Sequence, residues 1–222
     1  MDDIITIAKE RAEKFEVGNI IVATNTGATA TLVHQAFGSG YRVYAVGNPA
    51  AAHTKRLVGH SGISETTQKN LEAIGIRVVL KTQSLFQAME RGGAKYDIGA
   101  NFDIWGHTFK VAHLDEVIEK TCSKGQFNAV SIIFNTLQLF GESLRVCIEV
   151  TMMAADSGQL PLDKDCLAIS RPSDISNCPH AAVVMRPSRT MDIFMGNLRI
   201  KDVTLVPGPK DHWFNNKPLW VG

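Results

Sequence analysis

Neither sign of charge is in clear excess in this chain, and that balance excludes one class of function. The 222 residues carry 23 Lys and Arg against 22 Asp and Glu, a formal net charge of +1. Lys and Arg also form no cluster along the sequence, so the electrostatic footprint of a nucleic-acid-binding protein is missing. We therefore expect no nucleic-acid partner.

Long apolar runs are absent too. The most hydrophobic block, residues 132–155, is interrupted by Asn135, Glu142, Arg145 and Glu149, and no stretch approaches the roughly 20 apolar residues that span a bilayer. The sequence begins Met1-Asp2-Asp3, which is acidic where a signal peptide would be positively charged. These absences predict a cytoplasmic protein with no membrane association.

Cysteine is scarce and widely spaced. Cys122, Cys147, Cys166 and Cys178 form no CxxC pair, which argues against a disulfide framework and against a zinc site. We expect Cys147 and Cys166 to be small buried hydrophobic residues, and we expect no metal site.

The residues that are present describe a globular domain. Hydrophobic residues make up 45% of the chain and charged residues 20%, which is ordinary for a protein with a substantial core. Short β-branched runs alternate with helical patterns, and this predicts a three-layer α/β/α fold with a mostly parallel sheet. Strands are expected at 19–23, 42–46, 76–80, 167–169, 181–185 and 198–206. Helices are expected at 2–16 (closed by Gly18), from 30 onward, at 64–75 with Ser64 as the N-cap, from 112, at 128–140 and at 143–157. On the last of these helices Arg145, Glu149 and Asp156 project from one side, which is typical of a solvated or salt-bridged face.

The stretch 19–33, NIIVATNTGATATLV, is the most informative part of the chain. A buried strand ends in a turn of small polar residues, and a helix with apolar Ala30, Leu32, Val33, Ala36 and Phe37 follows at once. The first turn of a helix presents unpaired amide donors and a positive dipole end, a suitable site for an anion. We interpret the turn as a phosphate cradle made of Thr24, Asn25, Thr26, Gly27, Ala28 and Thr29.

An ordinary strand–helix loop capped by Thr24 or Thr26 explains the same residues equally well, because Thr and Asn are common helix caps. The turn lacks the Gly-Lys pair of a Walker loop and the three glycines of a dinucleotide fingerprint. Spacing alone therefore supports an oxyanion site with no particular ligand.

Two segments resemble a known family. ATNTGATATLV (residues 23–33) is similar to the first strand–helix turn of the pyruvate kinase C-terminal domain, where the loop holds a sugar phosphate in many pyruvate kinases. FGESLRVCIEV (140–150) with MAADSG (153–158) resembles a conserved block of stand-alone prokaryotic proteins that have this fold without the catalytic barrel. Some members are associated with flavin mononucleotide (FMN). The resemblance implies one pyruvate kinase C-terminal-like domain over 1–222, with an inserted loop around 91–110 and an extended tail, 207–222.

The resemblance also extends the candidate site. The turn at 59–63 is similar to a family turn after the second strand, and 82–83 occupies the place of another family turn beside the site. These matches add His60, Ser61, Gly62, Thr82 and Gln83. Relatives carry a glycine-rich ligand turn at the place of 170–180, where this chain has two prolines and no glycine; Pro fixes φ and lacks a donor, so that backbone is not reproduced.

The expected function is binding of a phosphorylated small molecule, with FMN as the cofactor that the resemblance implies. The alternatives are a flavin-dependent oxidoreductase or phosphate-ester hydrolase, for which no catalytic residues are identified, and a regulatory protein that responds to a sugar phosphate. Trp105 and His107 in the inserted loop are expected either to cover a flat ligand or to pack against a second subunit. The subunit contact is preferred because Trp is enriched at interfaces, hence a homo-oligomer. The cradle hypothesis further predicts that Thr26→Val with Gly27→Val abolishes phosphate-ester binding while the fold stays intact.

Overall fold

A mixed six-stranded sheet forms the centre of the molecule. The structure, a computed structural model, describes residues 4–47, 62–80, 101–104, 107–110, 133, 136–137, 139–171, 180–195 and 197–206. The strands of this sheet are β1 (Asn19–Ala23), β2 (Arg42–Val46), β3 (Arg77–Val79), β6 (Cys166–Ser170), β7 (His180–Arg186) and β8 (Arg199–Val206), in the spatial order β3-β2-β1-β6-β7-β8. β1, β2, β3 and β6 run parallel, and β7 is antiparallel to both β6 and β8.

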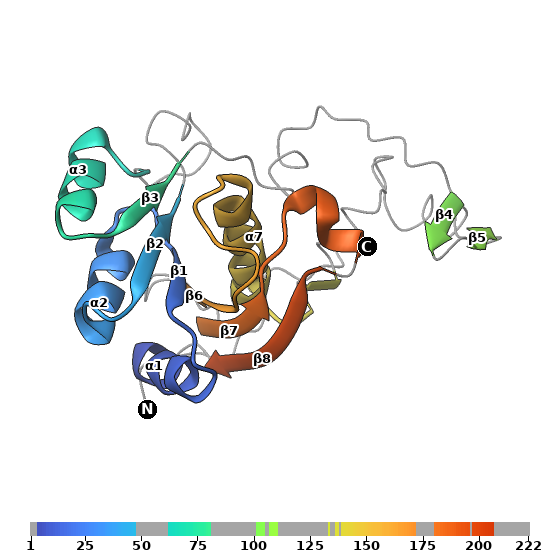
Figure 1. Ribbon diagram of the computed structural model, residues 1–222, viewed down its shortest axis with the longest axis horizontal. Coiled ribbons are helices and arrows are strands. Elements are labelled where there is room, and N and C mark those ends of the chain that lie inside the picture. Colours follow the sequence, from blue (N-terminus) through green and yellow to red (C-terminus); the bar gives the residue numbers. More distant parts are fainter. Residues whose placement is uncertain are drawn as a thin grey trace, which may run out of the picture.

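Helices cover both faces of the sheet (Figure 1). On one face lie α1 (Ile4–Lys14), α2 (Ala28–Phe37) and α3 (Glu65–Ala73), and on the other lies α7 (Glu142–Asp156). Side chains along each strand alternate between the two faces, as the pleat requires. Ile20 and Val22 therefore pack under α1 and α2, while Ile21 packs under α7. The inner strands β1, β6 and β7 are buried on both sides, which explains their continuous apolar runs.

The predicted three-layer α/β/α fold with a mostly parallel sheet is confirmed, and the expected strands at 19–23 and 42–46 have the observed bounds. Two of the apolar positions expected on this helix, Leu32 and Ala36, are exposed. The buried stripe of α2 passes through Ala30, Val33 and Phe37, and Leu32 is 45% exposed beside it. In the part of the chain that the structure describes, no helix has both the length and the apolar character needed to cross a bilayer.

Within the predicted insertion, the described residues form a two-stranded antiparallel hairpin of β4 (Asn101–Ile104) and β5 (His107–Lys110). The rest of that insertion, the predicted helix from 112 and the tail 207–222 lie outside the described residues. Of the predicted helix at 128–140, the described residues 133, 136 and 137 are helical. The expectation of one domain over residues 1–222, with an inserted loop and an extended tail, therefore stays a prediction.

The end of α1 differs from its prediction. Gly18 does not close the helix; Glu16 takes the left-handed conformation, with φ of 53°. The amide of Val17 donates to the carbonyl of Ala12 at 2.8 Å, and the amide of Glu16 donates to that of Glu13 at 3.2 Å. This pair of bonds is a Schellman motif, whose left-handed position is usually occupied by Gly.

Glu16→Gly is therefore expected to stabilise the protein by about 0.5–1 kcal/mol, because the left-handed conformation is strained for a residue with a Cβ and unstrained for Gly. Urea unfolding measures the change. The matched control is Glu13→Gly inside α1, which should destabilise by about 1 kcal/mol. If both variants lose stability equally, the left-handed assignment at Glu16 is wrong.

Candidate functional site

The carboxyl edge of β1 and β6 is the switch point of this topology. From β1 the chain continues through α2 to β2 on one side, whereas β6 lies on the other side of β1 and follows α7, which covers the opposite face. Strand order thus changes direction between β1 and β6. In open α/β sheets, ligands bind outside the carboxyl ends of the strands at such a point.

The predicted cradle lies at this edge, directly after β1. Gly27 is the residue before α2 and has φ of 83°, a left-handed conformation that favours Gly. The amide of Gly27 donates to Oγ1 of Thr24 at 3.0 Å, and the amide of Ala28 donates to Oγ1 of Thr26 at 3.5 Å. Both bonds close the turn ahead of α2. The N-cap position itself is Gly27, which has no side-chain cap hydrogen bond, so the alternative of a helix capped by Thr24 or Thr26 is wrong.

Further donors remain at the start of α2. Its first intrahelical bond runs from the amide of Thr31 to the carbonyl of Gly27, at 3.0 Å. Helix geometry leaves the preceding amides, those of Thr29 and Ala30, without an intrahelical acceptor. Asn25 and Thr26 are exposed beside them. The amides of Gly27 and Ala28 are therefore bonded within the turn. Because Ala30 is fully buried, the amide of the partly exposed Thr29 is the one that can donate to an anion.

Helix α3 packs directly against this turn. A Cβ added at Gly27 would lie 3.0 Å from Cγ2 of Thr67 and 3.1 Å from Cδ1 of Leu71. Helix α3 therefore blocks a ligand from approaching Gly27 on the side that it covers. Gly27→Val would also be strained by its φ, so the expectation that this substitution leaves the fold intact is wrong.

The turn after β2 supports the turn after β1. The amide of Thr24 donates to the carbonyl of Val46 at 2.9 Å. A Cβ added at Gly47 would lie only 2.0 Å from the carbonyl oxygen of Thr24. The two backbones approach so closely that only Gly fits at position 47, a requirement that no local pattern in the sequence indicated.

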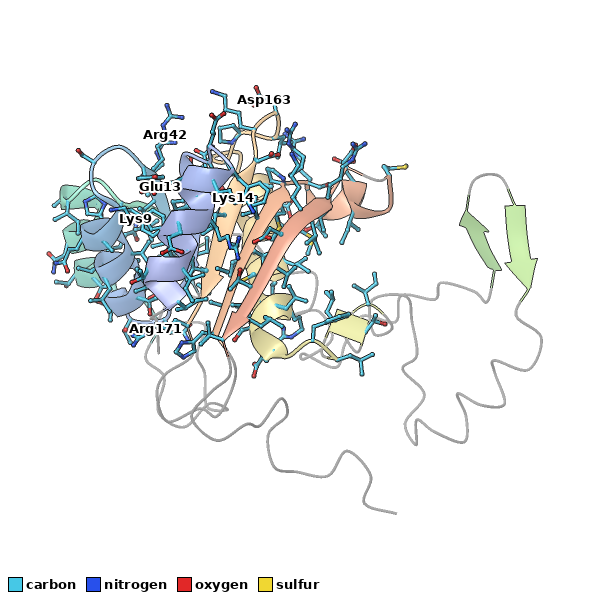
Figure 2. The ribbon with its side chains drawn as sticks, turned by 90° about the horizontal axis from the view of Figure 1, so that it is seen from below. Lys9, Glu13, Lys14, Arg42, Asp163 and Arg171 are labelled. Atoms are coloured by element: carbon cyan, nitrogen blue, oxygen red, sulfur yellow. The ribbon has the colours of Figure 1, made fainter. Side chains whose placement is uncertain are left out.

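Arg171 adds positive charge to the same edge. β1 and β6 pair in parallel, with Val22 opposite Ile169. Thr24 and Arg171 are the first residues after β1 and β6, so they follow adjacent strands at matching register positions. Figure 2 shows Arg171 at one end of the sheet and Arg42 at the other. The site residues predicted from the sequence do not include Arg171, because the neighbourhood of β1 and β6 is set by strand pairing.

Of the other five predicted site residues, the structure describes one, Gly62. Gly62 is buried just before Ser64, the N-cap of α3, whose Oγ accepts the amide of Thr67 at 3.1 Å as predicted. His60, Ser61, Thr82 and Gln83 lie outside the described residues. Among the residues that are described, no three His, Cys, Asp or Glu side chains gather as metal ligands would.

Polar residues on α7 form salt bridges, as their spacing predicted. Nη1 of Arg145 lies 2.9 Å from Oε2 of Glu149, and its Nη2 lies 3.2 Å from Oε1 of Glu142. Asp156 accepts hydrogen bonds from the amide and the hydroxyl of Thr190. An ordinary surface salt bridge has exposed charges. Here the Arg145 guanidinium is buried, with 8% of its side chain exposed.

Cys147 and Cys166 are fully buried, as predicted. Burial strongly raises the pKa of each thiol above its ordinary value, so both stay protonated at neutral pH. The Sγ of Cys147 donates to the carbonyl of Ala168, at 3.5 Å. These thiols are packing residues with no thiolate character.

The fold and the turn at the carboxyl edge of β1 together define this class: an α/β protein with a polar helix N-terminus at the switch point of its sheet. No protein-family model matches the chain. Among solved structures, Cryptosporidium parvum pyruvate kinase in complex with ADP is similar over 93% of this chain, with 13% identity and a TM-score of 0.30. The chain spans 23% of the length of that kinase chain, and a superposition this loose carries no argument about the site.

Proposed function

We propose that this protein binds a phosphorylated small molecule at the carboxyl edge of β1 and β6, with the phosphate on the first turn of α2. The observation that carries the proposal is the position of that turn at the switch point of the sheet. The amide of Thr29 would donate to the phosphate, and Arg171 would supply positive charge from the neighbouring strand end. FMN is the first ligand to test, because the sequence resembles a family with FMN-associated members.

The expected result for Arg171→Gln is a loss of FMN affinity of about tenfold or more, since a hydrogen bond to a charged group contributes about 1.5–3 kcal/mol. Thr26→Val should alter affinity by a smaller factor, because its hydroxyl bonds the backbone at a long 3.5 Å. Flavin fluorescence titration measures both dissociation constants. Arg42→Gln is the matched control, because it removes the same charge at the opposite end of the sheet (Figure 2).

Comparison with riboflavin, which lacks the phosphate, separates the phosphate contribution from that of the ring. FMN should bind more tightly than riboflavin to the wild type, and Arg171→Gln should narrow that difference. Equal binding of the two flavins would remove the phosphate cradle from the proposal. If neither flavin binds while a sugar bisphosphate does, the ligand is a sugar phosphate and the regulatory alternative is favoured.

A further inference from the structure

A polar cavity lies at the opposite edge of the sheet from the cradle. It has a volume of about 420 Å³ and is formed by the end of β7, the following segment with the 3-10 helix η2 (Thr190–Met195), and the start of β8. Four cationic side chains line it, namely Arg186, Arg189, Arg199 and Lys201. In Figure 2, Asp163, next to the cavity residue Leu162, lies at the other end of the molecule from Arg171.

The strand register sets two of these cations against each other. Arg186 on β7 and Arg199 on β8 are direct cross-strand partners. Like charges in opposed positions of an antiparallel pair destabilise a sheet. Asp165 pairs with Arg186 and lowers this repulsion, and an anion bound between the two arginine side chains would lower it further.

A β-bulge places a third cation at the same cavity. Val184 pairs with Asp202 and Met185 with Ile200, so Lys201 is the extra residue on β8. Bulges redirect a side chain and are frequent beside functional sites. The Lys201 ammonium here reaches Asp165.

One carboxylate holds two of the cations in place. Asp165 accepts a hydrogen bond from Nε of Arg186 at 2.7 Å and another from Lys201. Burial alone would raise the pKa of Asp165, yet the bonds from Lys201 and Arg186 hold it below its ordinary value, so it is ionised at neutral pH. Asp192 also lies in the cavity wall. Among the described residues, two carboxylates therefore accompany the four cationic side chains, a difference of two positive charges.

We propose that this cavity binds a phosphate dianion, either free or as the terminal group of a small phosphorylated molecule. The excess of two positive charges matches the charge of a phosphate near pH 7, and the volume fits a small molecule. Arg189 and Arg199 would contact the phosphate oxygens, while Asp165 keeps Arg186 and Lys201 at the cavity wall. This site lies apart from the cradle and does not depend on it.

The test is a titration of ¹⁵N-labelled protein with inorganic phosphate at constant ionic strength, with amide and arginine side-chain signals monitored by NMR. Saturable shifts are expected at Ser188, Arg189 and Arg199. Failure of the proposed β1 site would appear separately, as unchanged signals at Thr29 and Ala30. Repeating the titration with glycerol 2-phosphate distinguishes the two sources: tighter binding than phosphate indicates an ester ligand, and weaker binding indicates the free anion.

Arg189→Gln with Arg199→Gln should weaken phosphate binding at this cavity about tenfold or more. The matched control, Lys14→Gln with Arg42→Gln, removes the same charge outside the cavity and should leave affinity within twofold (Figure 2). Arg189→Gln alone serves if the double variant unfolds, because Arg189 is exposed. Equal losses in the cavity and control variants, or no saturable shift in the wild type, would overturn the proposal.

Discussion

Gly47→Ala is expected to destabilise the protein by about 3 kcal/mol or more, the upper range for steric overpacking. The new Cβ would lie 2.0 Å from the carbonyl oxygen of Thr24, a backbone atom that no rotamer change can move. Relief requires β1 and β2 to separate at their carboxyl ends, where the amide of Thr24 bonds the carbonyl of Val46. Urea unfolding gives the free-energy change.

The same substitution tests how the candidate site is supported. Because Thr24 begins the cradle, its displacement should also weaken phosphate-ester binding in whatever fraction remains folded. Gly40→Ala is the control, since nothing lies within 4 Å of its added Cβ. Equal unfolding midpoints for the two variants would show that the two turns are not in close contact.

Arg145→Ala is expected to lower the free energy of unfolding by about 3 kcal/mol. Its guanidinium pairs with Glu149 at 2.9 Å, and only 13% of the Glu149 side chain is exposed. Removal of one member of a buried ion pair leaves the other charge uncompensated, at a cost of about 3–5 kcal/mol. Some solvent access to Glu149 places the expected value at the low end of that range.

Two further variants identify the cause of that loss. Glu142→Ala removes the more exposed partner, whose side chain is 43% exposed, and should change stability by less than about 0.5 kcal/mol. Arg145→Met with Glu149→Met removes both buried charges and should recover most of the lost stability. If the double variant is as unstable as Arg145→Ala, lost packing and not an unpaired charge is responsible.

Local sequence patterns were sufficient to predict features that depend on contacts within a single helix or turn. Ser64 was identified as a helix cap because its hydroxyl meets an amide three residues ahead, a contact within one turn of chain. Arg145 and Glu149 were placed on one side of a helix by their four-residue spacing. The end of α1 lies at the limit of this reasoning, because hydrogen bonds among residues 12–17, and not the nearest Gly, chose Glu16.

The sequence by itself determined the alternation of strands and helices, hence the layered α/β class, and the position of a polar turn after the first strand. Only the tertiary structure decided which strands are neighbours, and with them the closeness of Gly47 to Thr24, the matching positions of Thr24 and Arg171, and the opposed pair Arg186 and Arg199. The physical reason is the sequence separation of the contacts that decide each feature. Hydrophobic periodicity reports which face of an element is buried, whereas pairing and register depend on contacts between residues far apart in the chain.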